Sequence, residues 1–170
     1  MVVSSAKEGV CRRKAAPLSS GRAKVIGVIG ASSCSEELYR VAEEVGEEIA
    51  RRGALVICGG RGGVMEAACR GAKRRGGTTI GVLPDRETRS ANEYVDIAIA
   101  TGLGEARNSL IVNSADGLIA VSGSYGTLSE IAFALKLGKP IVGISTWDVD
   151  ERIEKARSAS EAVNLIFERT

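Results

Sequence analysis

The chain contains 170 residues, of which 44% are hydrophobic and 26% are charged, and its formal net charge at pH 7 is +2. This length and composition are typical of a globular protein with a core of its own. Because no apolar run approaches the roughly 20 residues of a membrane span, we expect no membrane partner and a cytoplasmic location. The four cysteines form no C-x-x-C pair and the chain has no histidine, so we expect reduced thiols and no metal site.

The first 23 residues have a net charge of +4, whereas the rest of the chain has a net charge of −2. They hold five basic residues against one glutamate, Glu8, and show little apolar periodicity. We therefore expect a basic, flexible N-terminal extension at residues 1–23, followed by a single Rossmann-like domain at residues 24–170. The extension lacks the apolar h-region of a secretory signal. Its alternative roles are a subunit contact or a nucleic-acid-binding arm, and we expect no nucleic-acid partner.

Six short segments from residue 24 onward are rich in β-branched residues and apolar along nearly their whole length. Strands with apolar side chains on both faces belong in the middle of parallel sheets. We therefore predict strands at residues 24–30, 54–60, 78–84, 95–101, 116–123 and 139–145.

Apolar residues at helical spacing lie between most of these strands and after the last one. They predict helices over residues 38–49, 65–75, 105–114, 127–137 and 158–168. Ser33, Thr127 and Ser158 are each followed three residues later by glutamate, as in a capping box. This alternation predicts an α/β fold that is Rossmann-like and doubly wound, with a mostly parallel sheet in a three-layer α/β/α sandwich. Residues 152–157 fit either an edge strand or a helix.

Three predicted strands end in loops rich in glycine and serine, at residues 30–35, 59–66 and 122–130. In a doubly wound sheet the ligand lies beyond the carboxyl ends of the strands. Glycine lets the backbone approach that ligand, and the helix N-terminus that follows attracts an anion. We predict a phosphorylated ligand, with simple tight turns as the alternative. The candidate phosphate and ligand contacts are Gly30, Ser32, Ser33, Gly59, Gly60, Arg61, Gly62, Gly63, Gly123, Ser124, Tyr125, Gly126 and Thr127.

These loops match neither of the common nucleotide-binding fingerprints. Counted from Gly60, Met65 stands where G-x-G-x-x-G requires its third glycine, and the loop follows the second strand instead of the first. Lys139 is followed by Pro140, so no Walker A motif is present. We therefore do not expect an ordinary NAD-dependent enzyme or a P-loop NTPase.

Arg107 and Glu130 are the candidate catalytic residues. If both side chains face the crevice, the carboxylate can bind ribose hydroxyls or act as an acid or base. The guanidinium can then hold a phosphate or a leaving base. The alternatives are a helix cap that pairs Glu130 with Thr127, and an exposed turn at Arg107.

Two further side chains also have alternatives. Arg61 could hold a phosphate, or it could pair with Glu66 or with a neighbouring subunit. Tyr125 could pack on a ring of the ligand or cover the end of its helix. Because aromatic residues make up only 4% of the chain, few other side chains can stack on a heterocycle.

The stretches "GGRGGVMEA" and "SGSYGTLSEIAFALKLGKPIVGI", in this order on the alternating frame, resemble the superfamily that contains the LOG cytokinin-activating phosphoribohydrolases and the molybdenum cofactor carrier proteins. The resemblance covers about residue 24 to the end. It implies a Rossmann-like fold and a homo-oligomer, a dimer or a tetramer. The loop after the second strand is one residue shorter than in LOG enzymes and looks closer to the carrier-like branch.

The LOG hallmark P-G-G-x-G-T-x-x-E falls on residues 122–130, where it implies a phosphate loop and a catalytic glutamate at Glu130. Ser122 and Ser124 replace its proline and its second glycine. The catalytic arginine of the LOG stretch Met-His-x-Arg-Lys falls on Arg107, although the methionine, histidine and lysine around it are replaced. The matching hallmark positions are Gly123, Gly126, Thr127 and Glu130.

Two functions follow from the loops and the resemblance. We favour a carrier-like binding protein for a phosphorylated heterocycle, a nucleotide or a molybdopterin-type cofactor, with no cofactor required. The alternative is a phosphoribohydrolase that cleaves the N-glycosidic bond of nucleoside 5′-monophosphates with Arg107 and Glu130. We do not expect a lysine decarboxylase, because nothing in the chain suggests a lysine that binds pyridoxal phosphate.

Overall fold

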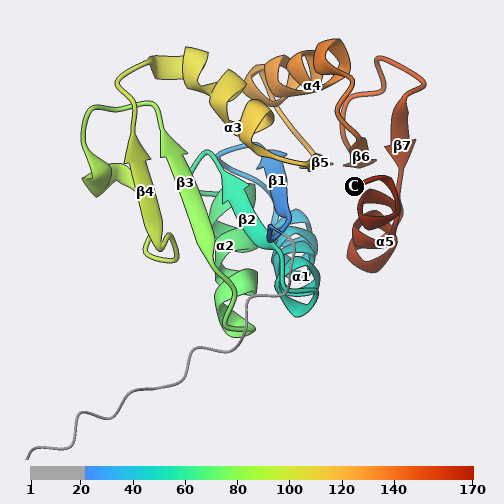
Figure 1. The fold of residues 1–170 in the computed structure, drawn as a ribbon, viewed down its shortest axis with the longest axis horizontal. Helices are drawn as coiled ribbons and strands as arrows, with labels where there is room; N and C mark the ends of the chain where they lie inside the picture. The colour runs from blue at the N-terminus through green and yellow to red at the C-terminus, as the bar shows by residue number, and fades with distance from the viewer. Residues whose placement is uncertain (1–21) are drawn as a thin grey trace, which may run out of the picture.

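The computed structural model describes residues 22–170, so the predicted basic extension lies outside the described residues except for its last two. Strands and helices follow one another in the predicted order (Figure 1). The elements are β1 (Val25–Gly30), α1 (Glu36–Arg51), β2 (Leu55–Cys58), α2 (Val64–Arg74), β3 (Thr79–Leu83), β4 (Ile97–Ala100), α3 (Asn108–Ser114), β5 (Gly117–Val121), α4 (Tyr125–Leu137), β6 (Ile141–Ile144), β7 (Ile153–Lys155) and α5 (Ala159–Arg169), with 3₁₀ turns at Thr88–Ser90 and Gly104–Arg107.

The seven strands form one sheet in the order β4-β3-β2-β1-β5-β6-β7, and every neighbouring pair is parallel. The predicted doubly wound, Rossmann-like α/β fold is confirmed, with a sheet that is parallel throughout. Residues 152–157, for which strand and helix were both open, contain edge strand β7. The strand order reverses between β1 and β5, and the pairing of these two strands extends to Gly30 and Val121. The loops after these two strands therefore flank the position where Rossmann-like sheets bind ligands.

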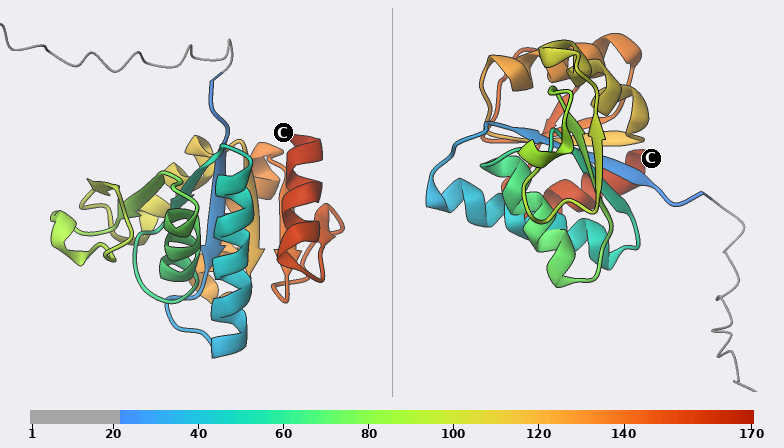
Figure 2. Two further views of the ribbon diagram at one scale, coloured as in Figure 1. Left: turned by 90° about the horizontal axis from the view of Figure 1, so that it is seen from below. Right: turned by 90° about the vertical axis from the view of Figure 1, so that its left-hand side faces the viewer.

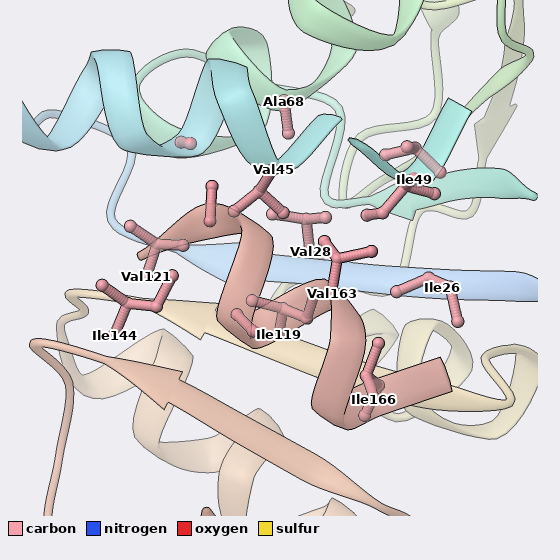
Figure 3. Close-up of a cluster of buried hydrophobic side chains, with 14 of the residues drawn as sticks. Ile26, Val28, Val45, Ile49, Ala68, Ile119, Val121, Ile144, Val163 and Ile166 are labelled. Carbon is pink, nitrogen blue, oxygen red and sulfur yellow. The ribbon is translucent and has the colours of Figure 1, made fainter. Parts of the chain in front are cut away.

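Helices cover both faces of the sheet, as the right-hand view of Figure 2 shows. On one face, α1, α2 and α5 pack through side chains such as Val45 and Val163 against strand residues such as Val28 (Figure 3). On the other face, α3 and α4 bury Ile111 and Ile131 against the sheet. Because both faces of the central strands are covered, their nearly continuous apolar sequences are explained.

Helices α1 and α2 pack closely because each presents a glycine to the other. A Cβ on Gly46 of α1 would lie 1.9 Å from the Ala68 carbonyl oxygen, and a Cβ on Gly71 of α2 would lie 1.9 Å from that of Glu43. Only glycine permits backbones to meet this closely. The contact holds α2 in place, together with the glycine-rich loop that precedes it.

Of the three predicted capping boxes, one has the predicted hydrogen bond from a backbone amide to the serine side chain. Ser158 caps α5 by accepting a hydrogen bond from the Glu161 amide at 3.2 Å. The prediction for Ser33 is wrong, because α1 begins one residue after Ser35, whose side chain accepts from the Leu38 amide. The prediction for Thr127 is also wrong, because α4 begins two residues earlier and Thr127 lies inside its first turn.

No helix within residues 22–170 is long and apolar enough to cross a membrane. A cytoplasmic location stays a prediction.

Candidate functional site

The loops after β1, β2 and β5 meet at one rim of the sheet and enclose a cleft of about 240 Å³. The turn before α3 and the N-terminus of that helix close its remaining side. The loops that the sequence singles out therefore converge at the switch point. The cleft is lined by Ile29, Gly30, Ser32, Gly59, Arg61, Met65, Glu105, Arg107, Asn108, Ser124, Gly126, Thr127 and Glu130.

The cleft brings together both candidate catalytic residues and seven of the thirteen candidate ligand contacts. Gly62 lines a neighbouring hollow of about 680 Å³, which shares Arg61 with the cleft. The predicted contacts that line neither cavity are Ser33, Gly60, Gly63, Gly123 and Tyr125.

The glycines outside the cleft shape its loops. Gly63 has φ +63°, and a Cβ there would lie 2.5 Å from the Ala31 carbonyl oxygen, so this glycine lets the first two loops touch. Gly123 has φ +148°, and a Cβ there would lie 2.7 Å from the side chain of Thr127. Both positions need glycine for the close approach of neighbouring protein atoms.

Helices α2 and α4 both begin at the cleft without a capping side chain. Their N-cap residues, Gly63 and Ser124, make no side-chain hydrogen bond to the helix. The first N–H groups of an α-helix have no acceptor within the helix, and the helix dipole adds partial positive charge at the same place. The first amide of α2, at Val64, donates instead to the Ala31 carbonyl oxygen at 3.1 Å. The N-terminus of α4 is therefore the one that offers its first amides to the cleft, an arrangement that suits an anion.

Arg107 lies inside the cleft wall instead of on an exposed turn. Its residue is only 6% exposed, and its guanidinium lies against Gly59, where a Cβ would come within 2.7 Å of Nη2. Nη1 donates a hydrogen bond to the side-chain oxygen of Asn108. Asn108 in turn donates to the Ser129 hydroxyl at 2.9 Å. These contacts hold the guanidinium at the boundary between α3, α4 and the loop after β2.

Two buried polar atoms of the cleft have no hydrogen-bond partner among residues 22–170. They are the Nε of Arg107 and the Oγ1 of Thr127, a residue that is 2% exposed. Buried polar groups in proteins nearly always have a partner, and an unpaired one costs about 1 to 3 kcal/mol. Both residues line the cleft, so a ligand with hydrogen-bonding oxygens would satisfy them.

Glu130 is 6% exposed at the base of the cleft. Burial raises the pKa of its carboxyl to about 8, because desolvation disfavours the charged form. The positive charge of Arg107 lowers this pKa in part, and the negative charge of Glu105 raises it. No ion pair joins Arg107 to Glu130 in the described part of the chain. At neutral pH the carboxyl is therefore mostly protonated and can donate a proton.

Arg61 pairs with Asp85, not with Glu66. Its guanidinium donates to the carboxylate at 2.6 Å across the neighbouring hollow, and both side chains are more than 40% exposed. The hydrogen bond from Ser90 and the bond from Arg61 lower the pKa of Asp85. Because the pair is exposed, it contributes little stability and leaves Arg61 able to turn toward a ligand.

Sequence reasoning missed the residues that brace the loop after β5. Trp147 donates its indole N–H to the Ser124 carbonyl oxygen at 3.2 Å, and its ring centroid lies 6.1 Å from that of Tyr125. Tyr125 is 82% exposed. The cleft-lining role of Glu105 and Met65 was missed as well. The position of Trp147 could have been predicted in part. It follows the end of a predicted strand by two residues, and the ends of parallel strands lie at the rim where the glycine-rich loops meet.

A family model described as the SLOG cluster4 family matches residues 23–169, and the chain belongs to this family. A curated but uncharacterised protein of Archaeoglobus fulgidus is 51% identical over 139 residues, which cover 82% of this chain and 91% of that protein. A cytokinin riboside 5′-monophosphate phosphoribohydrolase of Mycobacterium tuberculosis is 36% identical over 128 residues, which cover 69% of this chain and 67% of the enzyme.

Among solved structures, the molybdenum cofactor binding protein of the phototrophic bacterium Rippkaea orientalis has a TM-score of 0.83 and 38% identity. The match covers 88% of this chain and 98% of that protein. The predicted resemblance to the superfamily of LOG phosphoribohydrolases and molybdenum cofactor carrier proteins is confirmed by these matches together.

Proposed function

We propose that this protein is a carrier-like binding protein for a phosphorylated heterocycle, a nucleotide or a molybdopterin-type cofactor, whose phosphate binds in the cleft. One observation carries the proposal: Arg107 and Thr127 line the cleft, and the Nε of the first and the hydroxyl of the second are buried without a partner among the described residues. Phosphate oxygens accept hydrogen bonds from both kinds of group. The N-terminus of α4, which has no side-chain cap, adds amide donors to the same place.

The ligand's phosphate and its ring occupy different cavities in this proposal. The cleft volume of about 240 Å³ is below the roughly 300–1,000 Å³ of typical small-molecule sites. The hollow of about 680 Å³ meets the cleft at Arg61. A ligand that spans Arg61 has its phosphate at the N-terminus of α4 and its heterocycle in the hollow.

The backbone at Ser122 supports the carrier over the hydrolase. This residue stands at the hallmark proline and has φ +55°. Its amide also donates to the Ile144 carbonyl oxygen at 2.9 Å. Proline has φ near −65° and no N–H, so it fits neither feature. The loop therefore differs in conformation from one that begins with proline, and the similarity to the Rippkaea orientalis cofactor-binding protein over 98% of its length points the same way.

The hydrolase is the second candidate, and the buried Glu130 favours it. With a pKa of about 8, this carboxyl holds a proton at neutral pH and can donate it to a departing base. Arg107 beside it can hold the phosphate or the base. The similarity to the Mycobacterium tuberculosis phosphoribohydrolase supports this candidate.

Incubation of the purified protein with AMP separates the two candidates. A carrier binds AMP and releases neither adenine nor ribose 5-phosphate over many hours. A hydrolase releases both, and Glu130→Gln, which keeps the shape of the side chain, abolishes the release. Adenosine is the matched ligand without phosphate. AMP and adenosine of equal affinity would contradict the hydrolase and a carrier of nucleotides, whereas carriage of a molybdopterin-type molecule is tested by the mass of the bound ligand.

The natural ligand is identified by native mass spectrometry of the protein as purified. A bound pterin mass supports carriage of a molybdopterin-type molecule. A bound purine monophosphate excludes molybdopterin as the sole ligand and leaves the AMP incubation to decide between carrier and hydrolase.

We further propose a homo-oligomer, a dimer or a tetramer, that assembles through the face covered by α3 and α4. Ile97 and Ile99 of edge strand β4 pair in register with Ile80 and Val82, whose side chains belong to this face. Exposed large apolar side chains that gather on one face often mark an interface. Apart from Tyr125, the large exposed apolar side chains of β4, α3 and α4 are Ile97, Ile99, Leu110, Phe133 and Leu137.

A further inference from the structure

The loop that joins β5 to α4 is tied to the end of β6 and to the segment after it by three hydrogen bonds. The Ser122 amide donates to the Ile144 carbonyl oxygen at 2.9 Å. The Thr146 hydroxyl donates to the Ser122 carbonyl oxygen at 2.6 Å. The Trp147 indole N–H donates to the Ser124 carbonyl oxygen at 3.2 Å. The two side chains come from residues 23 and 24 positions further along the chain.

Ser122 needs such support because its backbone is strained. Its φ of +55° lies in the left-handed region, which costs a non-glycine residue roughly 1 to 2 kcal/mol. Strained backbone of this kind persists only where its surroundings hold it. Both polar groups of the Ser122 backbone are held, its amide by the end of β6 and its carbonyl by Thr146.

The bonds from Thr146 and Trp147 hold two carbonyl oxygens of the loop, and their donors lie outside the cleft. Thr146 and Trp147 do not line the cleft, whereas Ser124, Gly126 and Thr127 of the same loop do. An anion site needs amide donors toward the ligand and carbonyl oxygens away from it, since carbonyl oxygens repel phosphate. The ring of Trp147 also lies beside that of Tyr125 at the first residue of α4, which adds an apolar contact at the helix start.

We propose that Thr146 and Trp147 are positioning residues that hold the loop between β5 and α4 in its anion-binding conformation. This role rests on the proposed function, because it concerns the phosphate held by that loop. Neither residue touches the ligand. They act through the backbone of Ser122 and Ser124, so their loss weakens the selection for phosphate while leaving contacts to the heterocycle in place.

The test compares four variants of the full chain. Thr146→Val removes the hydroxyl and keeps the side-chain shape, Thr146→Ser keeps the hydroxyl, and Trp147→Phe removes the N–H and keeps an aromatic ring. Thr79→Val is the matched control, because its hydroxyl donates to the Tyr94 carbonyl oxygen at 2.6 Å where β3 begins, at the opposite rim of the sheet. Calorimetry gives the dissociation constants of AMP and adenosine, and hydrogen exchange follows the amides of residues 122–127.

Thr146→Val and Trp147→Phe are each expected to weaken AMP binding about fivefold, the effect of one hydrogen bond, with adenosine binding unchanged. Both variants speed exchange across residues 122–127. Thr146→Ser restores the wild-type values, and Thr79→Val leaves the ratio of AMP to adenosine affinity unchanged even where it lowers the melting temperature.

The assignment is overturned if exchange across residues 122–127 stays at the wild-type rate in both variants. It is also overturned if exchange accelerates while the preference for AMP over adenosine is kept. A wild-type protein without that preference refutes the nucleotide ligand of the proposed function instead, and the exchange comparison then still decides whether the two side chains hold the loop.

Discussion

Gly59 and Arg107 are in direct contact: a Cβ on Gly59 would lie 2.7 Å from Nη2 of the arginine. The glycine at the end of β2 thereby makes room for a guanidinium that comes from the turn before α3. Arg107 reaches the cleft only because position 59 has no side chain. The glycine that sequence reasoning assigned to close approach of a ligand is thus also needed for the approach of an arginine.

Gly59→Ala is expected to displace the guanidinium and to weaken AMP binding about tenfold or more, since a charge-assisted hydrogen bond contributes roughly 1.5 to 3 kcal/mol. The atoms that the new methyl group meets are the ends of two flexible side chains, Arg107 and Met65, so the fold tolerates the change. Calorimetry on a double-mutant cycle with Arg107→Ala is the measurement. In the Arg107→Ala background, Gly59→Ala should have no further effect, and additive losses would show that the glycine acts independently.

Thr127→Val is expected to change stability and binding in opposite directions. The hydroxyl is buried without a partner, so its replacement by a methyl group of similar size stabilises the free protein by about 1 kcal/mol. AMP loses a hydrogen bond and binds about fivefold more weakly. Urea unfolding and calorimetry give the two values, with Thr127→Ser as the control that keeps the hydroxyl. A loss of stability in Thr127→Val would place the hydroxyl in an internal hydrogen bond.

The raised pKa of Glu130 predicts how stability depends on pH. Its pKa is about 8 in the folded chain and 4.5 as an ordinary value, so between these the folded state binds a proton that the unfolded state has lost. The contribution of Glu130 to the free energy of unfolding therefore falls as pH rises through this window, by on the order of 5 kcal/mol, and is constant above it. Glu130→Gln removes this fall. Urea unfolding at pH 5, 6.5 and 8.5 checks it, and parallel profiles for the two proteins would contradict the shift.

The left-handed backbone of Ser122 predicts that glycine at this position raises the stability of the protein and that proline lowers it. Ser122→Gly relieves the left-handed strain and is expected to raise the free energy of unfolding by up to about 1 kcal/mol. Ser122→Pro restores the LOG hallmark residue yet loses the bond to Ile144 and requires a different φ, so it costs roughly 3 kcal/mol or more. Urea unfolding of both variants is the measurement. A proline variant as stable as the wild type would show that the loop adopts the LOG conformation readily.

The proposed oligomer is tested by Ile97→Glu. This side chain is 48% exposed at the edge strand, so a charge there leaves the fold intact and disrupts an apolar interface. Light scattering after size exclusion is expected to give an oligomer for the wild type and a monomer for the variant. Val149→Glu, at a residue 52% exposed on the loop between β6 and β7, is the matched control and should keep the oligomer. A monomeric wild type refutes the oligomer.

Much of the fold could be predicted because the buried strands are apolar on both faces, a pattern that depends on local sequence alone. The convergence of the glycine-rich loops followed from the strand order of a doubly wound sheet. The start of α1 was misplaced because Ser33 and Ser35 both precede acidic residues, and only the backbone decides which serine caps the helix.

The contacts that complete the site join residues far apart in the sequence, so no local pattern reports them. Thr146 donates a hydrogen bond to Ser122, which lies 24 residues earlier in the sequence. Arg107, just before α3, contacts Gly59, just after β2. Helix α4 begins at Tyr125, so Thr127 lies in the cleft wall instead of at a cap, and the loop before the helix contains the left-handed backbone of Ser122. Such a conformation is uncommon for serine and is not expected from sequence.

The central claim is that the unpaired donors of the cleft hold a phosphate, and an NMR titration tests it most directly. Inorganic phosphate and then AMP are added to isotope-labelled protein while the backbone amides and the arginine side-chain N–H signals are followed. The largest shifts are expected at the amides of Gly126 and Thr127 and at the Nε–H of Arg107. If these three signals stay unmoved while shifts gather elsewhere, for example around Lys155 and Arg157 in the cavity beyond β6, the phosphate binds at another place and the account is wrong.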